Sequence, residues 1–473
     1  MFNHSNFQSK DFIEPSLIND DFINLFNKPG PYYSSYPILG EWKSTPDNFD
    51  HEKTLIEYFK ENPDNPLYLY LHIPYCAKLC YYCSCRIHIS NKREVINNFV
   101  QLLVKEIVML ENFFLKNKIK PNIKEIHFGG GTPSHLSVEE LKLIINSLKK
   151  FVVIENLEEF SMEIDPRTVN FEHFDHYASF GVDRISFGVQ DFDSDVQKKI
   201  NRIQPFELIE KIMINEIRKK FKGVNFDLLY GLPGQTLETF RQTIDLTIKL
   251  FPERITLIKY AHIPEKRKHM NMINPIDLPP QKDLPYMFVE STKALTEAGY
   301  DWVGIDHFAK KTDELAIAKK QGTVYRNFGG ETPGVTKDII CLGPTSTFSF
   351  GKYYAQSTYD LHEYRESIKK GIFPISKSYI LNNNDLIRRE CNFSLQCNQI
   401  LDIKKIEQNY NIVFKDYFKN EINKINLLVK KGFLVFDKDK IKVTTLGRYF
   451  VRHICQVFDT FINEETDYKV HGN

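Results

Sequence analysis

Four of the eight cysteines in this chain lie within ten residues, at Cys76, Cys80, Cys83 and Cys85. The first three have the spacing C-x3-C-x2-C and directly follow residues 67–74, where apolar residues alternate as in a strand. A loop with this spacing can place three thiolates on three corners of a cubane [4Fe–4S] cluster and leave the fourth iron open. An open iron binds a substrate or a cofactor, so the spacing predicts a reactive metal centre.

The cysteines have three other interpretations. Structural zinc prefers two ligand pairs on separate turns, and this loop does not offer them. Disulfides are disfavoured because residues 1–10 contain no apolar signal core, which predicts a protein of the reducing cytoplasm. The third interpretation, buried free thiols, is the one expected for the scattered residues Cys341, Cys391, Cys397 and Cys455.

Size and charge limit the possible functions. The chain has 473 residues, of which 42% are hydrophobic, as is usual for a globular enzyme. Its 62 lysines and arginines nearly balance 61 acidic residues, so no global charge draws it to nucleic acid or to an anionic membrane. The most apolar stretch, residues 99–110, is interrupted by Gln101, Lys105 and Glu106, which predicts that no segment spans a membrane.

The middle of the chain repeats a strand and helix pattern. Helical apolar spacing at residues 95–107 and 141–148, a capping box at Ser137 and Glu140, and Gly181 after a helical run separate the strand-like segments. The six predicted strands are residues 67–73, 124–128, 159–164, 184–189, 224–229 and 254–260. This order predicts an α/β protein with a parallel sheet rolled into a barrel or part of one, whose active site lies at the carboxyl ends of the strands.

The predicted strand ends carry residues suited to a nucleoside. A Gly-Gly-Gly-Thr-Pro turn occupies 129–133, and Glu163, Gln190 and Asp227 lie at later strand ends. Glycines let a ligand touch the backbone, and carboxylates accept hydrogen bonds from ribose hydroxyls. Each feature has an ordinary alternative, a flexible connection or a helix cap. Together on one rim they predict a nucleoside bound beside an iron–sulfur cluster.

These motifs resemble the radical S-adenosylmethionine superfamily, whose fold is a partial (β/α)6 barrel. A closer resemblance, over about residues 30–461, is to the oxygen-independent coproporphyrinogen III oxidase family. It includes the fourth cysteine, Cys85, and the N-terminal Gly-Pro-Tyr-Tyr-Ser-Ser-Tyr-Pro segment at 30–37. Other matching stretches are Leu-His-Ile-Pro-Tyr-Cys at 71–76, Phe-Gly-Val-Gln-Asp-Phe at 187–192, Asp-Leu-Leu-Tyr-Gly-Leu-Pro at 227–233 and Asp-His-Phe-Ala at 306–309. Shorter matches lie at 325–328, 387–389, 445–448 and 458–459.

The resemblance implies an activity. The family decarboxylates two propionates of coproporphyrinogen III to vinyl groups without oxygen, giving protoporphyrinogen IX for haem synthesis. A [4Fe–4S] cluster and S-adenosylmethionine generate the 5′-deoxyadenosyl radical that abstracts a propionate hydrogen. The expected partners are this substrate and a low-potential electron donor of the flavodoxin or ferredoxin type, with no nucleic acid or membrane. The resemblance also implies a cytoplasmic monomer.

The resemblance also implies roles for individual residues. Cys76, Cys80 and Cys83 would hold the cluster, and with Glu163 and Arg202 they form the expected catalytic set. The first S-adenosylmethionine would contact Tyr70, Gly130, Glu163 and Thr347. A second would contact Tyr82, Gly131, Thr132, Gln190, Arg202, Asp227 and Ala261. Without the resemblance, Arg202 is a surface or helix-terminal charge and the two tyrosines are packing aromatics.

Four positions depart from the family pattern. Tyr32 stands where the family usually has arginine, Gly329 and Glu331 where it usually has glutamine and tyrosine, and Thr347 where it has a more apolar residue. A substrate with four carboxylates calls for more arginines, so an added glutamate was not expected near it. These departures leave open a radical enzyme that acts on another acidic substrate.

Three domains are expected: residues 1–66 covering the active site, 67–375 forming the barrel with an extension, and 376–473 forming a winged-helix-like, mostly helical lid. The lid pattern comprises helices around residues 400–407 and 417–428, a hairpin at 433–443 and a last helix after Gly447. Its lysines alternate with acids, which disfavours nucleic-acid binding. Four arginines of the lid are candidates to meet propionates, Arg388, Arg389, Arg448 and Arg452.

The alternative function is that of the haem-chaperone relatives, which keep the barrel and deliver haem. Those relatives typically have an aromatic residue in place of the fourth cysteine and a shorter N-terminal part. Cys85 and residues 30–37 therefore favour the enzyme. Cys85 is not expected to be a cluster ligand, and its role has no physical explanation.

Overall fold

A computed structural model describes residues 11–45 and 49–462 of the chain. Six parallel strands form its centre, in the sheet order β2-β5-β6-β7-β8-β9. Their bounds are β2 Pro66–Ile73, β5 Asn122–Gly130, β6 Glu159–Ile164, β7 Arg184–Gln190, β8 Gly223–Tyr230 and β9 Arg254–Lys259. The six predicted strands and the partial parallel barrel are thus confirmed.

Further strands extend both edges, so the sheet has thirteen strands and stays open. Beyond β2, β14 pairs in parallel, and β15, β16, β17 and β1 follow as antiparallel neighbours. Beyond β9, β11 and β10 pair antiparallel. The bounds are β14 Asp338–Leu342, β15 Thr347–Phe350, β16 Tyr353–Ser357, β17 Ile375–Ile380, β1 Lys43–Ser44, β11 His307–Lys310 and β10 Tyr300–Val303.

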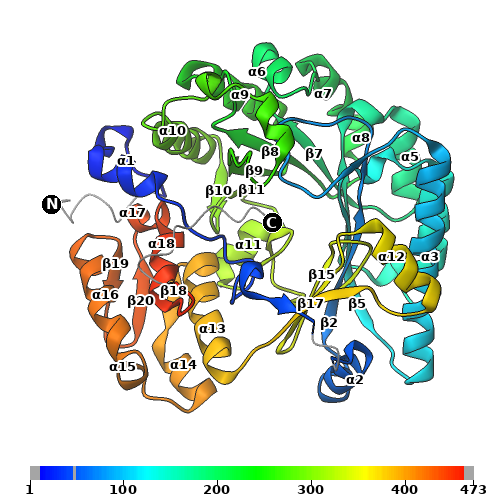
Figure 1. The fold of residues 1–473 in the computed structure, drawn as a ribbon. Coiled ribbons are helices and arrows are strands. Elements are labelled where there is room, and N and C mark those ends of the chain that lie inside the picture. The colour runs from blue at the N-terminus through cyan, green and yellow to red at the C-terminus, as the bar shows by residue number, and fades with distance from the viewer. Residues whose placement is uncertain (1–10, 46–48, 463–473) are drawn as a thin grey trace.

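Helices lie around the strands, as Figure 1 shows for α3, α5, α7 and α9. The predicted capping box is present: Ser137 Oγ accepts from the Glu140 backbone N–H at 3.2 Å, and the Glu140 carboxylate accepts from the Ser137 N–H at 2.8 Å. Gly181 has φ +96°, as predicted for a residue that ends a helix. The bounds are α3 Arg93–Lys116, α4 Val138–Leu148, α5 Phe171–Ser179, α6 Ser194–Lys199, α7 Phe206–Ile212, α8 Asn215–Arg218, α9 Leu237–Leu250, α10 Leu284–Glu297, α11 Glu314–Gln321 and α12 Leu361–Lys370.

The amino ends of the strands are closed by ion pairs. Arg184, the first residue of β7, donates to Glu159 at 2.7 Å, and Arg254 of β9 donates to Asp313 at 2.8 Å. All four side chains are largely buried, and their charges offset one another. Ligands therefore have to enter at the other end, where the strands carry the predicted site residues.

The C-terminal part combines helices with the three-stranded sheet β18-β20-β19. Residues 400–402 form a strand there, so the helix expected around residues 400–407 begins only at Ile403. The reason is that Ile400 pairs with Lys442 of β20, while Asp402 caps the helix by accepting from the Lys405 N–H at 3.1 Å. The bounds are α13 Asn383–Asn398, β18 Ile400–Asp402, α14 Ile403–Tyr410, α15 Phe414–Tyr417, α16 Lys419–Lys430, β19 Leu434–Phe436, β20 Lys440–Val443, α17 Thr445–Arg448 and α18 Val451–Cys455.

The N-terminal segment joins the two parts of the molecule. α1, Asp20–Asn27, packs its Phe22 ring 4.7 Å from the ring of Phe450. From there the chain passes across the barrel to β1, as Figure 1 shows in blue, and Tyr33 donates to Asp459 at 2.8 Å on the way. α2, His51–Glu61, then leads to β2. Within the described residues, none of the helices combines the length and apolar character that crossing a membrane requires.

Candidate active site

The cysteine loop follows β2 at its carboxyl end. Cys76 and Cys80 are buried, Cys83 is partly buried, and Cys85 is exposed. Hydrogen bonds fix the loop from outside: Asn201 donates to the Leu79 carbonyl at 2.8 Å and Arg267 to the Ser84 carbonyl at 2.6 Å. The three thiols with the C-x3-C-x2-C spacing thus lie on one anchored loop, which suits three corners of a cluster.

No pair of the eight cysteines, all of which lie in the described residues, forms a disulfide. The four scattered cysteines are buried, as expected. Thr132 donates its hydroxyl to Cys76 Sγ at 3.2 Å. Burial raises the pKa of the Cys76 thiol to about 12, so a thiolate there needs a cation. A cluster iron satisfies that need, and these residues therefore fit the predicted group.

Two arginines lie beside Cys80. Arg202 Nη1 is 3.5 Å from Cys80 Sγ, and Arg167 Nη2 is 3.6 Å from the same sulfur. Asp165 Oδ2 accepts from both, at 3.3 Å and 2.6 Å. Although burial acts to raise it, these guanidinium groups hold the pKa of the Asp165 carboxyl at about 2. Two positive charges and one negative charge leave an excess positive charge directed at the sulfur.

Arg202 is 7% exposed, so the interpretation of it as a surface charge is wrong. It also donates to the Gly188 carbonyl at 2.7 Å. A Cβ on Gly188 would come within 2.8 Å of Gln190 Nε2 and 2.9 Å of Arg202 Nη2, so these two predicted side chains converge there. Tyr82 is close enough to Arg202 and Cys80 to feel their charges, and burial raises the pKa of its phenol. Four predicted residues, Cys80, Tyr82, Gln190 and Arg202, are thereby brought together.

Glu163 lies inside the barrel at the end of β6. One carboxylate oxygen accepts from the Gly130 N–H at 3.1 Å, and the other is 3.3 Å from His127 Nε2. Tyr70 stacks on the His127 ring with centroids 5.8 Å apart and hydrogen-bonds His72 Nδ1 at 3.0 Å. His127 was not identified by the sequence analysis. Glu125, His127 and Gly129 are two residues apart along β5 and share one face of the strand, and this spacing could have placed His127 inside the barrel.

The three glycines at 129–131 pack tightly, so the interpretation of this turn as a flexible connection is wrong. Gly130 has φ +111°, and a Cβ there would lie 2.6 Å from His72 Cε1. A Cβ on Gly131 would lie 2.9 Å from the Ile73 carbonyl oxygen. The protein itself therefore requires the glycines, and ligand contact at Gly130 and Gly131 stays a prediction.

The remaining predicted residues are spread around the rim. Asp227 accepts from Ser186 at 3.0 Å and from Asn225 at 2.8 Å, while burial and the charge of Glu163 raise its pKa. Ala261 lies just past β9. Thr347 begins β15 and is buried, but among the described residues no side-chain hydrogen bond connects it to the other predicted residues.

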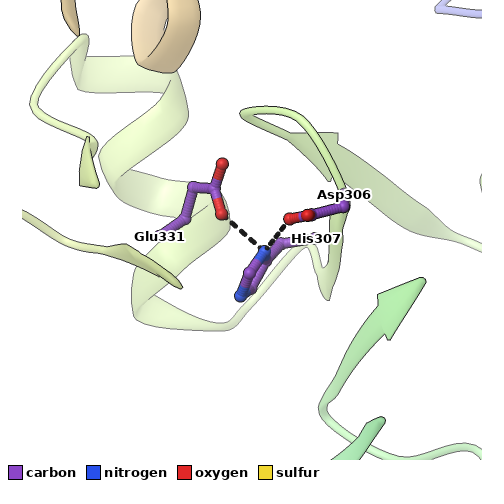
Figure 2. A group of neighbouring side chains, drawn as sticks. All are labelled: Asp306, His307 and Glu331. Atoms are coloured by element: carbon purple, nitrogen blue, oxygen red, sulfur yellow. Dashed lines mark hydrogen bonds and ion pairs between the residues drawn. The ribbon is translucent and has the colours of Figure 1, made fainter. Parts of the chain in front are cut away.

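Glu331, one of the departures from the family pattern, belongs to a buried ionic network of four residues. Figure 2 shows Asp306 and Glu331 on either side of the His307 ring. His307 Nδ1 is 2.8 Å from Asp306 Oδ1 and 2.6 Å from Glu331 Oε2, and Arg326 Nη1 is 3.2 Å and 2.5 Å from the same two oxygens. Despite burial, Glu331 and Asp306 raise the pKa of His307 to about 9.

Asp306, His307 and Glu331 have the residue types and proximity of a metal site. However, the Arg326 guanidinium and the protonated His307 already supply two positive charges for the two carboxylates. The network is therefore neutral at pH 7 without a metal. Glu331 consequently does not present a free negative charge that would repel a substrate with carboxylate groups.

The four arginines proposed to meet propionates all contact other groups of the protein. Arg388 pairs with Glu421 at 2.8 Å, and Arg448 lies 3.8 Å from the Trp302 ring centroid and donates to the Trp302 carbonyl. Arg389 donates to the Gly351 carbonyl at 3.2 Å. Arg452 donates to the Gly30 carbonyl at 2.9 Å, and its guanidinium lies 4.4 Å from the centroid of the Tyr32 ring.

Comparisons with known proteins agree with this geometry. The family model described as the radical SAM superfamily matches residues 70–247, and that of the HemN C-terminal domain matches residues 381–450. Oxygen-independent coproporphyrinogen III oxidase of Helicobacter pylori is 36% identical over 453 residues, covering 94% of this chain and 97% of the relative. The Escherichia coli protein of the same name is 34% identical, covering 94% and 95%.

The solved structure of Escherichia coli coproporphyrinogen III oxidase, described as a radical SAM enzyme, superposes with a TM-score of 0.86 and 33% identity. The match covers 91% of this chain and 98% of that structure. The predicted fold and the interpretation of the chain as an enzyme are confirmed. The chain belongs to the oxygen-independent coproporphyrinogen III oxidase family of radical S-adenosylmethionine enzymes.

Proposed function

We propose that this protein decarboxylates two propionates of coproporphyrinogen III to vinyl groups, giving protoporphyrinogen IX for haem biosynthesis without oxygen. The observation that carries the proposal is the excess positive charge of Arg202 and Arg167 at Cys80, on an anchored cysteine loop at the mouth of the barrel. Relatives that are 34% to 36% identical over 94% of the chain bear the name of this activity.

Cys76, Cys80 and Cys83 would hold a [4Fe–4S] cluster. The cluster would supply the electron that splits S-adenosylmethionine, and the carbon radical so formed would take a hydrogen atom from the propionate. Arg202, Arg167 and the Thr132 hydroxyl stabilise negative charge on the thiolates, since hydrogen bonds to sulfur tune a cluster. Loss of carbon dioxide, together with transfer of one electron from the substrate to a one-electron acceptor, would then leave the vinyl group.

Two S-adenosylmethionine molecules are part of the proposal. Around the first we place Tyr70, Gly130, Glu163 and Thr347, with the Glu163 carboxylate held by the Gly130 N–H and by His127. Around the second we place Tyr82, Gly131, Thr132, Gln190, Arg202, Asp227 and Ala261. The convergence of Gln190 and Arg202 over Gly188 supports this second group. A low-potential flavodoxin or ferredoxin would supply electrons to a monomeric enzyme in the cytoplasm.

The test is an anaerobic turnover of the reconstituted protein with a low-potential reductant, S-adenosylmethionine and coproporphyrinogen III. Porphyrins and 5′-deoxyadenosine are separated by chromatography. Protoporphyrin that forms only when S-adenosylmethionine is present supports the function. If 5′-deoxyadenosine forms without a decarboxylated product, the substrate is wrong. If neither forms, the proposal fails and haem binding becomes the next test.

Glu163→Ala tests the cofactor assignment in the same assay. Because the carboxylate is proposed to hold the cofactor ribose, this variant should keep the visible absorbance of the cluster but lose S-adenosylmethionine binding in equilibrium dialysis. Glu155→Ala is the matched control, since Glu155 is exposed and precedes the amino end of β6, whereas Glu163 lies at its carboxyl end. Wild-type affinity in Glu163→Ala would refute the role.

A further inference from the structure

Lys259 is the last residue of β9 and lies at the carboxyl end of the barrel strands. Its partly buried ammonium donates to Asn27 Oδ1 at 2.9 Å and lies 5.1 Å from the centroid of the Phe26 ring. Within residues 11–45 and 49–462, no carboxylate forms an ion pair with it. Lys259 is thus a cation held by a neutral amide and an aromatic ring.

Arg452 of α18 has a similar environment. Its Nη1 donates to the Gly30 carbonyl at 2.9 Å, and its guanidinium lies over the Tyr32 ring. In the part of the chain that the structure describes, Arg452 also lacks a carboxylate partner. Lys259 and Arg452 therefore both contact the segment from Phe26 to Tyr32, which comprises the end of α1 and the residues that follow it.

The nearby carboxylates do not neutralise this pair. Asp306 and Glu331 are engaged by Arg326 and His307, and Arg326 lies on the Tyr32 ring at 5.5 Å. The Tyr32 ring therefore contacts one arginine whose charge is balanced and one, Arg452, whose charge is not. Among the described residues, Lys259 and Arg452 are therefore two further cations that have no carboxylate partner.

Two cations without an anion are unfavourable for the folded protein, because each disfavours the charge of the other. Burial, followed by the charge of Arg452, lowers the pKa of Lys259 to about 7. A bound carboxylate would offset both charges and favour protonation of Lys259. Proteins keep such unfavourable arrangements chiefly where a ligand completes them.

We propose that Lys259 and Arg452 together bind one propionate carboxylate of the substrate at the rim of the barrel. This inference rests on the proposed function, because it takes the ligand to be a porphyrinogen with carboxylate side chains. Each cation has further N–H donors to offer besides the one that it gives to residue 27 or residue 30. Binding of the carboxylate would also hold the segment from Phe26 to Tyr32 over the bound substrate.

The test measures binding rather than turnover. Reconstituted protein with S-adenosylmethionine is titrated anaerobically with coproporphyrin III, whose fluorescence reports binding, and with its uncharged tetraamide. Lys259→Met should weaken coproporphyrin III binding about tenfold or more, since a charge-assisted hydrogen bond is lost. Tetraamide binding should be unchanged, and Lys259→Arg should bind the acid within about threefold of wild type.

Lys249→Met is the matched control, because Lys249 is 61% exposed and pairs with Glu210 on the surface. Cluster absorbance and the thermal midpoint verify folding, and Lys259→Gln provides the same comparison if Lys259→Met does not fold. A lysine that only holds Asn27 would weaken the acid and the tetraamide equally, which would overturn the inference. Equal acid binding by wild type and Lys259→Met would overturn it as well. If wild type itself bound no coproporphyrin III, the proposed function would fall with it.

Discussion

Two buried ionic clusters differ in how their charges are arranged. Beside Cys80, Arg167 and Arg202 share the single carboxylate of Asp165, and both also point an N–H at the sulfur. The cluster of Figure 2, completed by Arg326, has two carboxylates for two cations and closes on itself. An excess charge aimed at one atom indicates chemistry, whereas a closed neutral network holds the fold together.

The largest expected effect concerns Cys80, whose sulfur lies beside Arg167 and Arg202. Cys80→Ala removes one of the three thiolates, so the reconstituted protein should lose its broad visible absorbance and its iron. Absorbance spectra and iron analysis measure this, with the buried Cys391→Ala as a control that should keep both. Retention of the cluster in Cys80→Ala would show that the ligand assignment is wrong.

The second prediction tests the excess charge itself. Arg202→Gln keeps a polar side chain but removes the positive charge, so formation of 5′-deoxyadenosine should slow about 100-fold, or about 3 kcal/mol. Single-turnover chromatography gives the rate, and iron content should stay at the wild-type level. A rate within about threefold of wild type would mean that the charge at Cys80 is structural.

The third prediction concerns the closed network around Glu331. Glu331→Gln leaves Arg326 and His307 with one carboxylate instead of two, which should lower the free energy of unfolding by about 3 kcal/mol. Urea unfolding measures this loss. The rate of 5′-deoxyadenosine formation at 25 °C should change less than about threefold. A rate loss as large as that of Arg202→Gln would assign the network to the chemistry.

The smallest effect is a pH dependence of stability. His307 has a pKa of about 9 in the folded protein and an ordinary value of 6.5. Its protonation therefore stabilises the fold fully below pH 6.5, and this contribution is lost as pH rises through 9. Between pH 7 and pH 10 the loss should be about 2 to 3 kcal/mol.

Urea unfolding at the two pH values, compared between wild type and His307→Gln, isolates this residue from other titrating groups. The variant should show the smaller decrease in stability between pH 7 and pH 10. An equal decrease in both proteins would show that His307 is not protonated in the folded state at pH 7, and the network would then carry a negative charge.

The parallel strands and the rim were predictable because they depend on local sequence. Apolar periodicity identified all six central strands, and the residues that follow each strand had to meet at one end of a parallel sheet. The strand at Ile400 was mistaken for helix because its pairing with Lys442 joins residues far apart in the chain. His127 was not predicted because its contact with Glu163, at 3.3 Å, joins residues of two different strands that only the folded sheet brings together.

The sequence by itself determined the cysteine spacing, the strand order and the family, because these depend on residue types and their separation along the chain. Tertiary structure alone decided which charges are balanced. Nothing in the sequence indicates that Glu331 is neutralised by Arg326 and His307, or that Arg452 and Lys259 have no carboxylate partner among the residues that the structure describes. Ionic interactions fall off over a few ångströms, so the effect of a charge depends on neighbours that only folding brings together.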